Sequence, residues 1–378
     1  PFVVLSALAM VTERIGLIGT ASTTFDHPYH LARRFAALDH LSGGRAGWNI
    51  VTSSNALEAG NFGLAAMPDH AERYARAADV VAASLALWQS RDGAPPTPDK
   101  AAGVYLDEAA LCHDAHDGPY VRTAGPLNLP RPPQGRPLLA QAGSSEAGRA
   151  FAARHADIVF TVQSDLDAAR TFRADIRARA EQAGRDPDSI RVLPGIVPVL
   201  AETREEAETR LATLNAFGDP AHLRAKLEEF LNADLSGLDP DRPIPAGMVR
   251  IGTNQSSRSR AEVLMALAER DGLTLRQLML RLASGRGHLL VVGTGPDMAA
   301  RMAEWRDAGA ATSALAAVMI TGASNIVDKN SAAAAMSRVP ALMTGRVSVL
   351  VIPAACHALP TRNRSKRIVS QASSCRRC

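Results

Sequence analysis

Short apolar runs alternate with amphipathic stretches along most of the chain, and this alternation predicts repeated βα units. The predicted strands cover residues 15–20, 46–52, 137–142, 157–162 and 192–200. Each is followed by a predicted helix, over residues 29–41, 70–89, 145–155, 165–184 and 203–216. The last helix begins with a capping pattern, Thr203 with Glu206 three positions later. Such an order of elements is typical of an α/β protein with a parallel sheet.

The order of elements fits two topologies, an open doubly wound sheet or part of an eight-stranded barrel, and the pattern alone leaves both open. A dinucleotide-binding turn would place three spaced glycines directly after a strand. Gly293 and Gly295 follow the apolar run 289–292, but Met298 stands at the third glycine position. We therefore interpret this segment as a glycine turn that opens a helix over residues 296–308.

Three segments depart from the alternation. Residues 91–136 and roughly 218–288 are rich in Gly, Pro and Asp, and we expect them to be insertions on one face of the sheet. Residues 311–378 hold nine Lys and Arg against one acidic residue and none of the 16 aromatic residues. We expect this basic segment to lie outside the barrel, and its composition is that of an out-of-frame end in a GC-rich gene. Without aromatic residues to stack on bases, it does not indicate a nucleic-acid arm.

The overall composition is that of an ordinary globular protein, with 378 residues, 46% hydrophobic and 21% charged. No apolar run reaches the roughly 18 residues that a membrane-spanning helix needs. Residues 1–10 lack the basic start of a signal peptide, and four cysteines in this length make no disulfide framework. We therefore expect a cytoplasmic protein that acts on neither membranes nor nucleic acid.

The most informative segment is QAGSSEAGR at 141–149, where a predicted strand runs into a helix. Gly143 lets the backbone approach a ligand, while Ser144 and Ser145 offer hydroxyl groups beside the free amides of the helix start. A phosphate would find several donors there without a bound metal. A serine that only caps the helix explains the pattern equally well, so both interpretations stay open.

His70 and Tyr74 form a second candidate, because a spacing of four places them on one helix face. Both can donate to a phosphate or a ring carbonyl, although a purely structural role is the commoner outcome for such a pair. Further ligands at matched spacing are missing, so we predict no metal site. Cys112 and His113 suggest a thiol nucleophile, but their place in an insertion fits a solvated loop better.

Polar side chains also end two of the predicted strands. Thr20 closes the first strand, and Asn49 lies near the end of the second, followed by Thr52 and Ser53. The carboxyl ends of parallel strands are where the active sites of barrel enzymes lie. Taken alone, this signal is weak.

A resemblance to a known family is carried by eight strings in order along the chain. They are VTERIGL at 11–17, PYHLARRF at 28–35, LDHLSGGR at 38–45, WNIVTS at 48–53, NFG at 61–63, HAERY at 70–74, GPLN at 125–128 and QAGSS at 141–145. Together they resemble the nitrilotriacetate monooxygenase group of the bacterial-luciferase-like flavin monooxygenases, which also includes dibenzothiophene-sulfone and long-chain alkane monooxygenases. The resemblance covers residues 1 to about 310 and implies a (β/α)8 TIM barrel.

The resemblance implies an FMN-dependent monooxygenase of a two-component system. A separate NAD(P)H:flavin reductase would supply reduced FMN, which this subunit would use with O2 to insert one oxygen atom into a small organic substrate. The implied cofactor contacts are Thr20, Asn49, His70, Tyr74, Gly143, Ser144 and Ser145. No catalytic side chain is assigned, because the oxygen chemistry belongs to the cofactor. The two insertions are then natural lids that exclude water, and we expect a homo-oligomer.

The chain departs from the family pattern at both ends. Family members begin with about two further βα units, and they have a last strand where this chain continues with residues 311–315, ATSAL. The expected fold is therefore a partial barrel over residues 1–310 that lacks its first two βα units and its last strand. Such a barrel exposes open sheet edges. The alternative function is thus an inactive remnant that at most binds flavin or pairs with an intact relative.

Overall fold

The computed structural model describes residues 1–91, 99–104, 111, 115–245, 248–249, 258–285, 287–312, 317–319 and 349–352. Its helices are α1 (Phe2–Val11), α2 (Pro28–Ser42), α3 (Ala56–Asn61), α4 (His70–Gln89), α5 (Glu146–His155), α6 (Leu166–Gln182), α7 (Arg204–Ala216), α8 (Pro220–Leu231), α9 (Arg258–Asp271), α10 (Leu275–Gly285) and α11 (Gly295–Asp307). Its strands are β1 (Gly16–Ser22), β2 (Ala46–Val51), β3 (His116–Asp117), β4 (Arg122–Thr123), β5 (Leu138–Gln141), β6 (Ile158–Thr161), β7 (Arg191–Pro194), β8 (Ile196–Leu200), β9 (Leu289–Gly293), β10 (Ala317–Met319) and β11 (Val349–Ile352).

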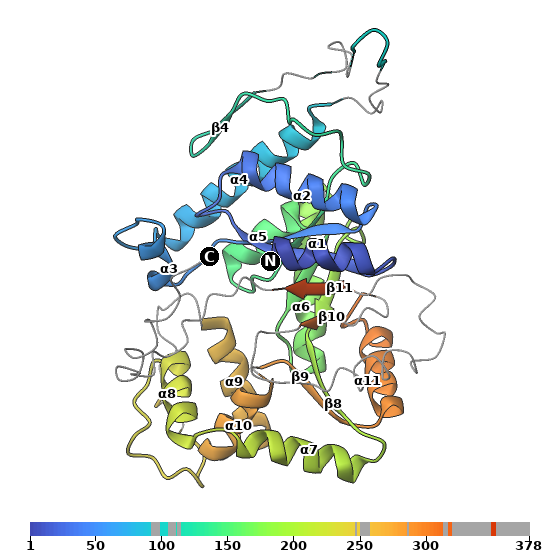
Figure 1. Ribbon diagram of the computed structural model, residues 1–378. Helices are drawn as coiled ribbons and strands as arrows, with labels where there is room; N and C mark the ends of the chain where they lie inside the picture. The colour runs from blue at the N-terminus through green and yellow to red at the C-terminus, as the bar shows by residue number, and fades with distance from the viewer. Residues whose placement is uncertain are drawn as a thin grey trace, which may run out of the picture.

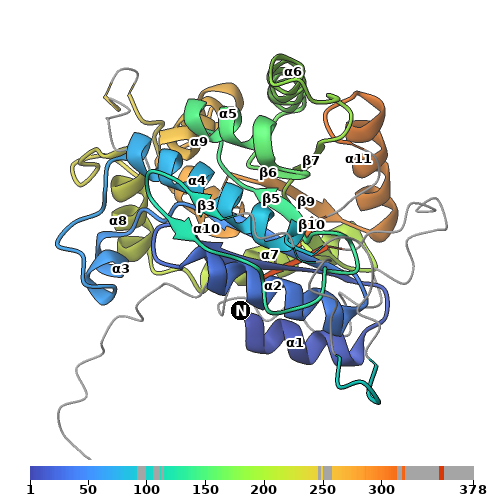
Figure 2. The same ribbon diagram turned by 90° about the horizontal axis from the view of Figure 1, so that it is seen from above.

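A seven-stranded sheet forms the centre of the molecule, with strand order β10-β11-β1-β2-β5-β6-β7 and every neighbouring pair parallel. Strands β8 and β9 form a second parallel pair. Helices stand around the strands when the molecule is viewed from above (Figure 2). All five predicted strands and their five helices are present, which confirms an α/β protein with a parallel sheet. The predicted strand 192–200 is divided at Gly195 into β7 and β8.

The two faces of the sheet carry different cores. On the outer face, Trp48 and Leu139 pack with Leu31 and Val80 of helices α2 and α4. On the inner face, Ile18, Phe160 and other residues of β1, β5, β6 and β7 pack against one another. Since side chains alternate along a strand, Asn49 next to Trp48 belongs to the inner face. The carboxyl end of this inner face is where the predicted polar strand ends meet.

Most of the described residues of 218–288 lie in helices, and we call α8, α9 and α10 the helical cap. Figure 1 shows these helices grouped together, apart from α2 and α4. They bury a core of their own, which includes Leu227, Leu231, Leu264 and Leu278. An insertion with its own leucine core holds its shape largely by itself.

Residues 91–136 contain the short hairpin β3–β4, which is tied to α4 by a buried carboxylate. Asp79 accepts hydrogen bonds from the backbone amides of Tyr120 and Val121, at 2.8 and 2.9 Å. It also lies 2.7 Å from His116 Nε2. These bonds lower the pKa of Asp79 although burial opposes the shift. The hairpin is thereby anchored to the outer side of the barrel-like body.

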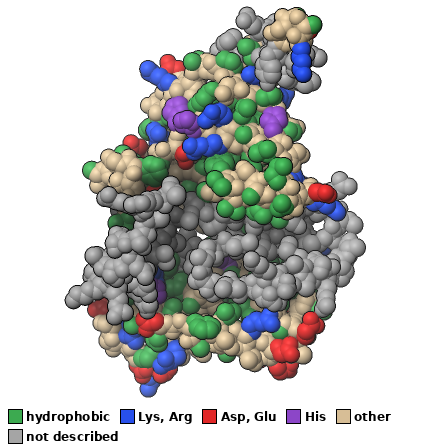
Figure 3. Space-filling view, in the orientation of Figure 1, with side chains coloured by type: hydrophobic (Ala, Val, Ile, Leu, Met, Phe, Trp, Pro, Cys, Tyr) green, Lys and Arg blue, Asp and Glu red, His purple; other side chains and the backbone are tan. Residues whose placement is uncertain are grey.

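The first helix and the last two described strands lie beside β1 of the sheet. Helix α1 packs through Leu5 and Ala9, while Val3 and Met10 of the same helix are exposed, and hydrophobic side chains gather over it in Figure 3. Strands β10 and β11 come from the segment 311–378 and join the sheet beside β1. Apart from these strands and Ala311–Thr312, that segment lies outside the described residues. For the residues outside the described part, the expected separation from the barrel stays a prediction. Within the described part of the chain, no helix is long and apolar enough to span a membrane.

Candidate functional site

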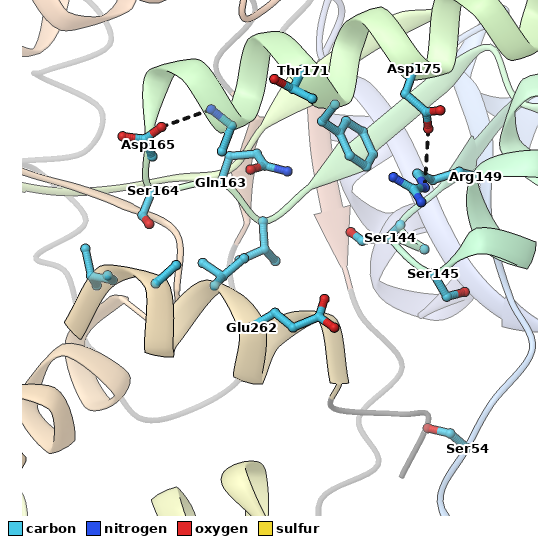
Figure 4. A pocket seen from close by; sticks show the side chains of 18 of the residues that line it. Ser54, Ser144, Ser145, Arg149, Gln163, Ser164, Asp165, Thr171, Asp175 and Glu262 are labelled. Atoms are coloured by element: carbon cyan, nitrogen blue, oxygen red, sulfur yellow. Dashed lines mark hydrogen bonds and ion pairs between the residues drawn. The ribbon is translucent and has the colours of Figure 1, made fainter. Parts of the chain in front are cut away.

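A cavity of about 970 Å³ opens at the carboxyl end of the sheet. Residues from five segments line it, namely 52–54, 70–74, 142–149, 162–175 and 262–270. The first four lie at the ends of β2, β5 and β6 and at the starts of the neighbouring helices, and the fifth is α9 of the helical cap. Figure 4 shows α6 and α9 on opposite sides of the space, with Ser144 and Ser145 between them at one end.

The turn between β5 and α5, which we call the serine turn (residues 142–145), forms one end of the cavity. Ser145 is the N-cap of α5, and its Oγ accepts a hydrogen bond from the Gly148 amide at 3.1 Å. The amides of Glu146 and Ala147 have no intrahelical acceptor, so they and the positive end of α5 face the start of the turn. The capping interpretation is therefore confirmed. It does not compete with anion binding, since a cap satisfies only one of the free amides.

Two glycines allow α4 to approach the serine turn closely. A Cβ atom built on Gly143 would lie 2.7 Å from the Tyr74 hydroxyl oxygen, and one on Gly148 would lie 2.9 Å from it. Any larger residue would push the tyrosine away. The glycines thus place the Tyr74 hydroxyl directly against the turn.

Tyr74 and His70 both carry neutral donors at this end of the cavity. Burial raises the pKa of Tyr74, and hydrogen bonds with Ser145, Gln141 and Thr52 oppose the rise. His70 Nε2 lies 3.4 Å from Ser145 Oγ, across 75 positions of sequence. Burial, and secondarily the charge of Arg73, lower the pKa of His70. At neutral pH the imidazole is accordingly uncharged and can donate one hydrogen bond.

Arginines also line the cavity, and the sequence-based prediction missed them. Arg149 Nη2 donates to Glu146 at 3.0 Å, and its Nε lies 3.3 Å from Asp175 Oδ2. Arg73 Nη1 donates to the carbonyl oxygen of Pro68. Arg73 lies three positions after His70, so the same helix-face rule that singled out Tyr74 could have found it.

Thr20 and Asn49 form a separate pair. They are opposite each other in the register of β1 and β2, and Asn49 Nδ2 donates to Thr20 Oγ1 at 3.0 Å. Neither is among the residues that line the cavity, whereas His70, Tyr74, Gly143, Ser144 and Ser145 all line it. The strand ends are linked nearby, because Ser22 Oγ lies 2.9 Å from Ser53 Oγ. The structure therefore brings five of the seven predicted residues together and leaves two on the inner face of the sheet.

Other predicted chemistry is outside this site. Cys112 and His113 lie outside the described residues. Gly295 opens α11 as expected, with Thr294 and Asp297 as a capping box. In the described ranges, no group of three or more His, Cys, Asp or Glu side chains could hold a metal ion.

Comparison with known proteins agrees with the family resemblance of the motifs. The model of the luciferase-like monooxygenase family matches residues 1–312. The chain belongs to this family. By membership it is classed with the flavin-dependent monooxygenases, as the motifs indicated.

Two relatives and one solved structure illustrate the similarity. The chain is 42% identical over 306 residues to nitrilotriacetate monooxygenase component A of Aminobacter aminovorans, covering 81% of this chain and 67% of the relative. It is 41% identical over 308 residues to N-acetyl-S-(2-succino)cysteine monooxygenase of Bacillus subtilis, covering 81% and 69%. The crystal structure of a riboflavin lyase with modified FMN and riboflavin superimposes with a TM-score of 0.67 and 33% identity, over 82% of this chain and 67% of that one.

The chain spans about two thirds of the length of these relatives. Dibenzothiophene-sulfone and long-chain alkane monooxygenases are further relatives. The predicted family group is therefore confirmed.

The residues present fit the phosphate end of a flavin mononucleotide. A dianionic phosphate needs several donors, a positive helix end and space close to the backbone. The serine turn offers two hydroxyl groups and two free amides, Tyr74 and His70 add neutral donors, and Gly143 keeps the space clear. The cavity thus suits a phosphate monoester at this end.

Proposed function

We propose that this protein is an FMN-dependent monooxygenase that holds the cofactor by its phosphate at the serine turn. The observation that carries the proposal is the convergence of His70 and Tyr74, from the start of α4, on Ser145 at the start of α5. Two helix starts that meet across 75 residues make an anion site of mostly neutral donors. Family membership supports a flavin as the source of the anion.

The chain's residues would bind and orient the cofactor rather than react with it. Ser144, Ser145 and Tyr74 would hold the phosphate. Thr20 and Asn49, which form their pair on the inner face of the sheet, would contact another part of the cofactor. Reduced flavin, when bound there, supplies the electrons that activate O2 for transfer of one oxygen atom to the substrate. Helix α9 lines the cavity, where it would help to keep water from the bound cofactor.

The source of electrons is a separate protein in this proposal. The relative from Aminobacter aminovorans is named as component A of its enzyme, which supports a second component here. We propose an NAD(P)H:flavin reductase as that partner, a small organic molecule as substrate, a homo-oligomeric assembly and a cytoplasmic location. Turnover with chemically reduced FMN and O2, in the absence of any reductase, tests the role of this chain separately from its partner.

Binding of FMN and riboflavin by the Ser145→Ala variant tests the phosphate assignment. Hydrogen bonds to a charged group contribute roughly 1.5–3 kcal/mol, so the dissociation constant of FMN should rise by about 10- to 100-fold. That of riboflavin, which lacks the phosphate, should not change. Thr203→Ala is the matched control, because Thr203 caps α7 in the same way and does not line the cavity. Equal weakening of both flavins would show that the turn acts on the ring or on folding instead.

A further inference from the structure

Three arginines are among the described residues that line the cavity, and they differ in their carboxylate partners. Arg149 pairs with Glu146 and Asp175. Arg270, on α9, pairs with Asp165 at 2.8 Å and with Asp271. Arg73 forms no ion pair with any carboxylate of the described ranges. Burial lowers its pKa, and Tyr74 and then Asp69, at the N-cap of the same helix, oppose this shift.

Arg73 is also buried. Only 8% of the residue is exposed, and although Nη1 donates to Pro68, its Nε atom is buried without a hydrogen-bond partner in the described part of the chain. A buried charged donor without an acceptor is costly, commonly by more than a neutral group. An arginine retained only to hold Pro68 would leave that donor unused. A ligand anion in the cavity, which Arg73 lines, would balance its charge.

The other side-chain donors of the proposed phosphate site carry no full positive charge. His70 and Tyr74, which lie on the same face of α4, are uncharged at neutral pH, and the hydroxyl groups of the serine turn are neutral as well. Helix ends supply only partial charge. Arg73 keeps its full charge, because a guanidinium stays protonated in proteins even where burial lowers its pKa.

We propose that Arg73 is the charge-selecting residue of this site, which recognises the dianionic phosphate monoester and sets the preference for FMN over riboflavin. The inference rests on the proposed function and adds a specific residue to it. The guanidinium would act as a planar set of donors to the phosphate oxygens, a geometry that lysine does not reproduce.

The experiment measures the ratio of the dissociation constants of riboflavin and FMN by fluorescence quenching, with inorganic phosphate as a competitor of FMN. Arg73→Gln removes the charge and keeps an amide donor for the Pro68 carbonyl, while Arg73→Met removes both. Both variants should lower the ratio by about 10- to 100-fold and should bind riboflavin like the wild type. Arg73→Lys should restore part of the ratio.

Arg76→Gln is the matched control on the same helix, since Arg76 donates to the Thr23 carbonyl and does not line the cavity. Its ratio should equal that of the wild type. Riboflavin binding reports folding of every variant, and using two neutral variants guards against one that does not fold. A folded neutral variant with the wild-type ratio would overturn the role of Arg73 while the proposed function stands. A wild-type protein that binds both flavins equally, or neither, would overturn the proposed function and this inference together.

Discussion

The serine turn and the helical cap face each other across the cavity and are held together by different forces. The serine turn is polar and short, and its groups are fixed by the Ser145 cap, the Tyr74 contacts and two glycines. The helical cap is apolar inside, and the buried residues of its leucine core all come from residues 227–282. Between them, α9 contributes an exposed ion pair, Arg270 with Asp165. We therefore expect changes in the helical cap and changes in the serine turn to have separate effects on the protein.

The largest expected effect is on the core of the helical cap. Leu278→Ala removes a fully buried side chain from α10, so the free energy of unfolding should fall by about 2–5 kcal/mol. Because the serine turn does not depend on this core, FMN affinity should change by less than about tenfold. Urea unfolding and a flavin titration measure the two quantities, with exposed His222→Ala on α8 of the same cap as the control. Loss of FMN binding in Leu278→Ala would mean that cap and turn are one unit.

The opposite end of α5 should respond to pH. Burial, followed by the charges of Arg154 and Arg185, lowers the pKa of His155 to about 4. The unfolded state takes up the proton first, so stability is fully present above about pH 6.5 and is lost as pH falls toward 4. The loss amounts to about 3 kcal/mol at most.

Equilibrium unfolding between pH 7 and pH 4 measures this dependence. His155→Gln should flatten it, whereas His222→Gln, exposed on α8, should leave it unchanged. A wild-type slope that survives in His155→Gln would assign the acid sensitivity to other groups.

A smaller effect is expected from closing the space at Gly143. Gly143→Ala places a methyl group against the Tyr74 hydroxyl and the Gln141 amide, so the tyrosine must shift. Overpacking of this kind costs about 1–3 kcal/mol, which corresponds to roughly a 10- to 100-fold loss of FMN affinity if it falls on binding. Gly60→Ala in α3 is the control, since nothing lies within 4 Å of its added methyl group. Unchanged FMN affinity in Gly143→Ala would contradict the close approach.

The smallest effect belongs to the ion pair between cap and body. The side chains of Arg270 and Asp165 are 44% and 42% exposed, so solvent screens their attraction. A double-mutant cycle of Arg270→Gln and Asp165→Asn should give a coupling of about 0–1 kcal/mol. The cycle is needed because Asp165 also caps α6 and Arg270 also pairs with Asp271. A coupling above about 2 kcal/mol would show that the pair locks the cap onto the body.

Local features of the fold were predictable because they depend on nearby residues. The capping box at Thr203 and Glu206, the helix His70–Gln89 and the strand starting at Ala46 occur where the sequence placed them. The division of 192–200 at Gly195 was not predicted. A Cβ there would overlap Phe160 and His288, which are distant in sequence and meet Gly195 only in the folded chain.

The candidate site likewise has a part that was predictable from neighbouring residues and a part that was not. Gly143, Ser144 and Ser145 were identifiable from a strand end, a glycine and two hydroxyl residues in a row. The sequence predicted only an insertion, rich in Gly, Pro and Asp, over residues 218–288, and the helices and leucine core of the helical cap were not predicted. Composition did not predict these helices, because their leucines form a core only when the three helices pack against one another.

The sequence by itself determined where helices and strands begin, which family the chain belongs to and which turn offers free helix amides. These are properties of local backbone hydrogen bonding and of motifs in a fixed order. Only the tertiary structure decided that His70 meets Ser145, that Thr20 and Asn49 form a pair apart from the cavity, and that Arg73 alone among the arginines of the cavity lacks a carboxylate in the described ranges. Such pairings depend on which surfaces the packed sheet and helices bring within hydrogen-bond distance, and that distance bears no relation to separation along the chain.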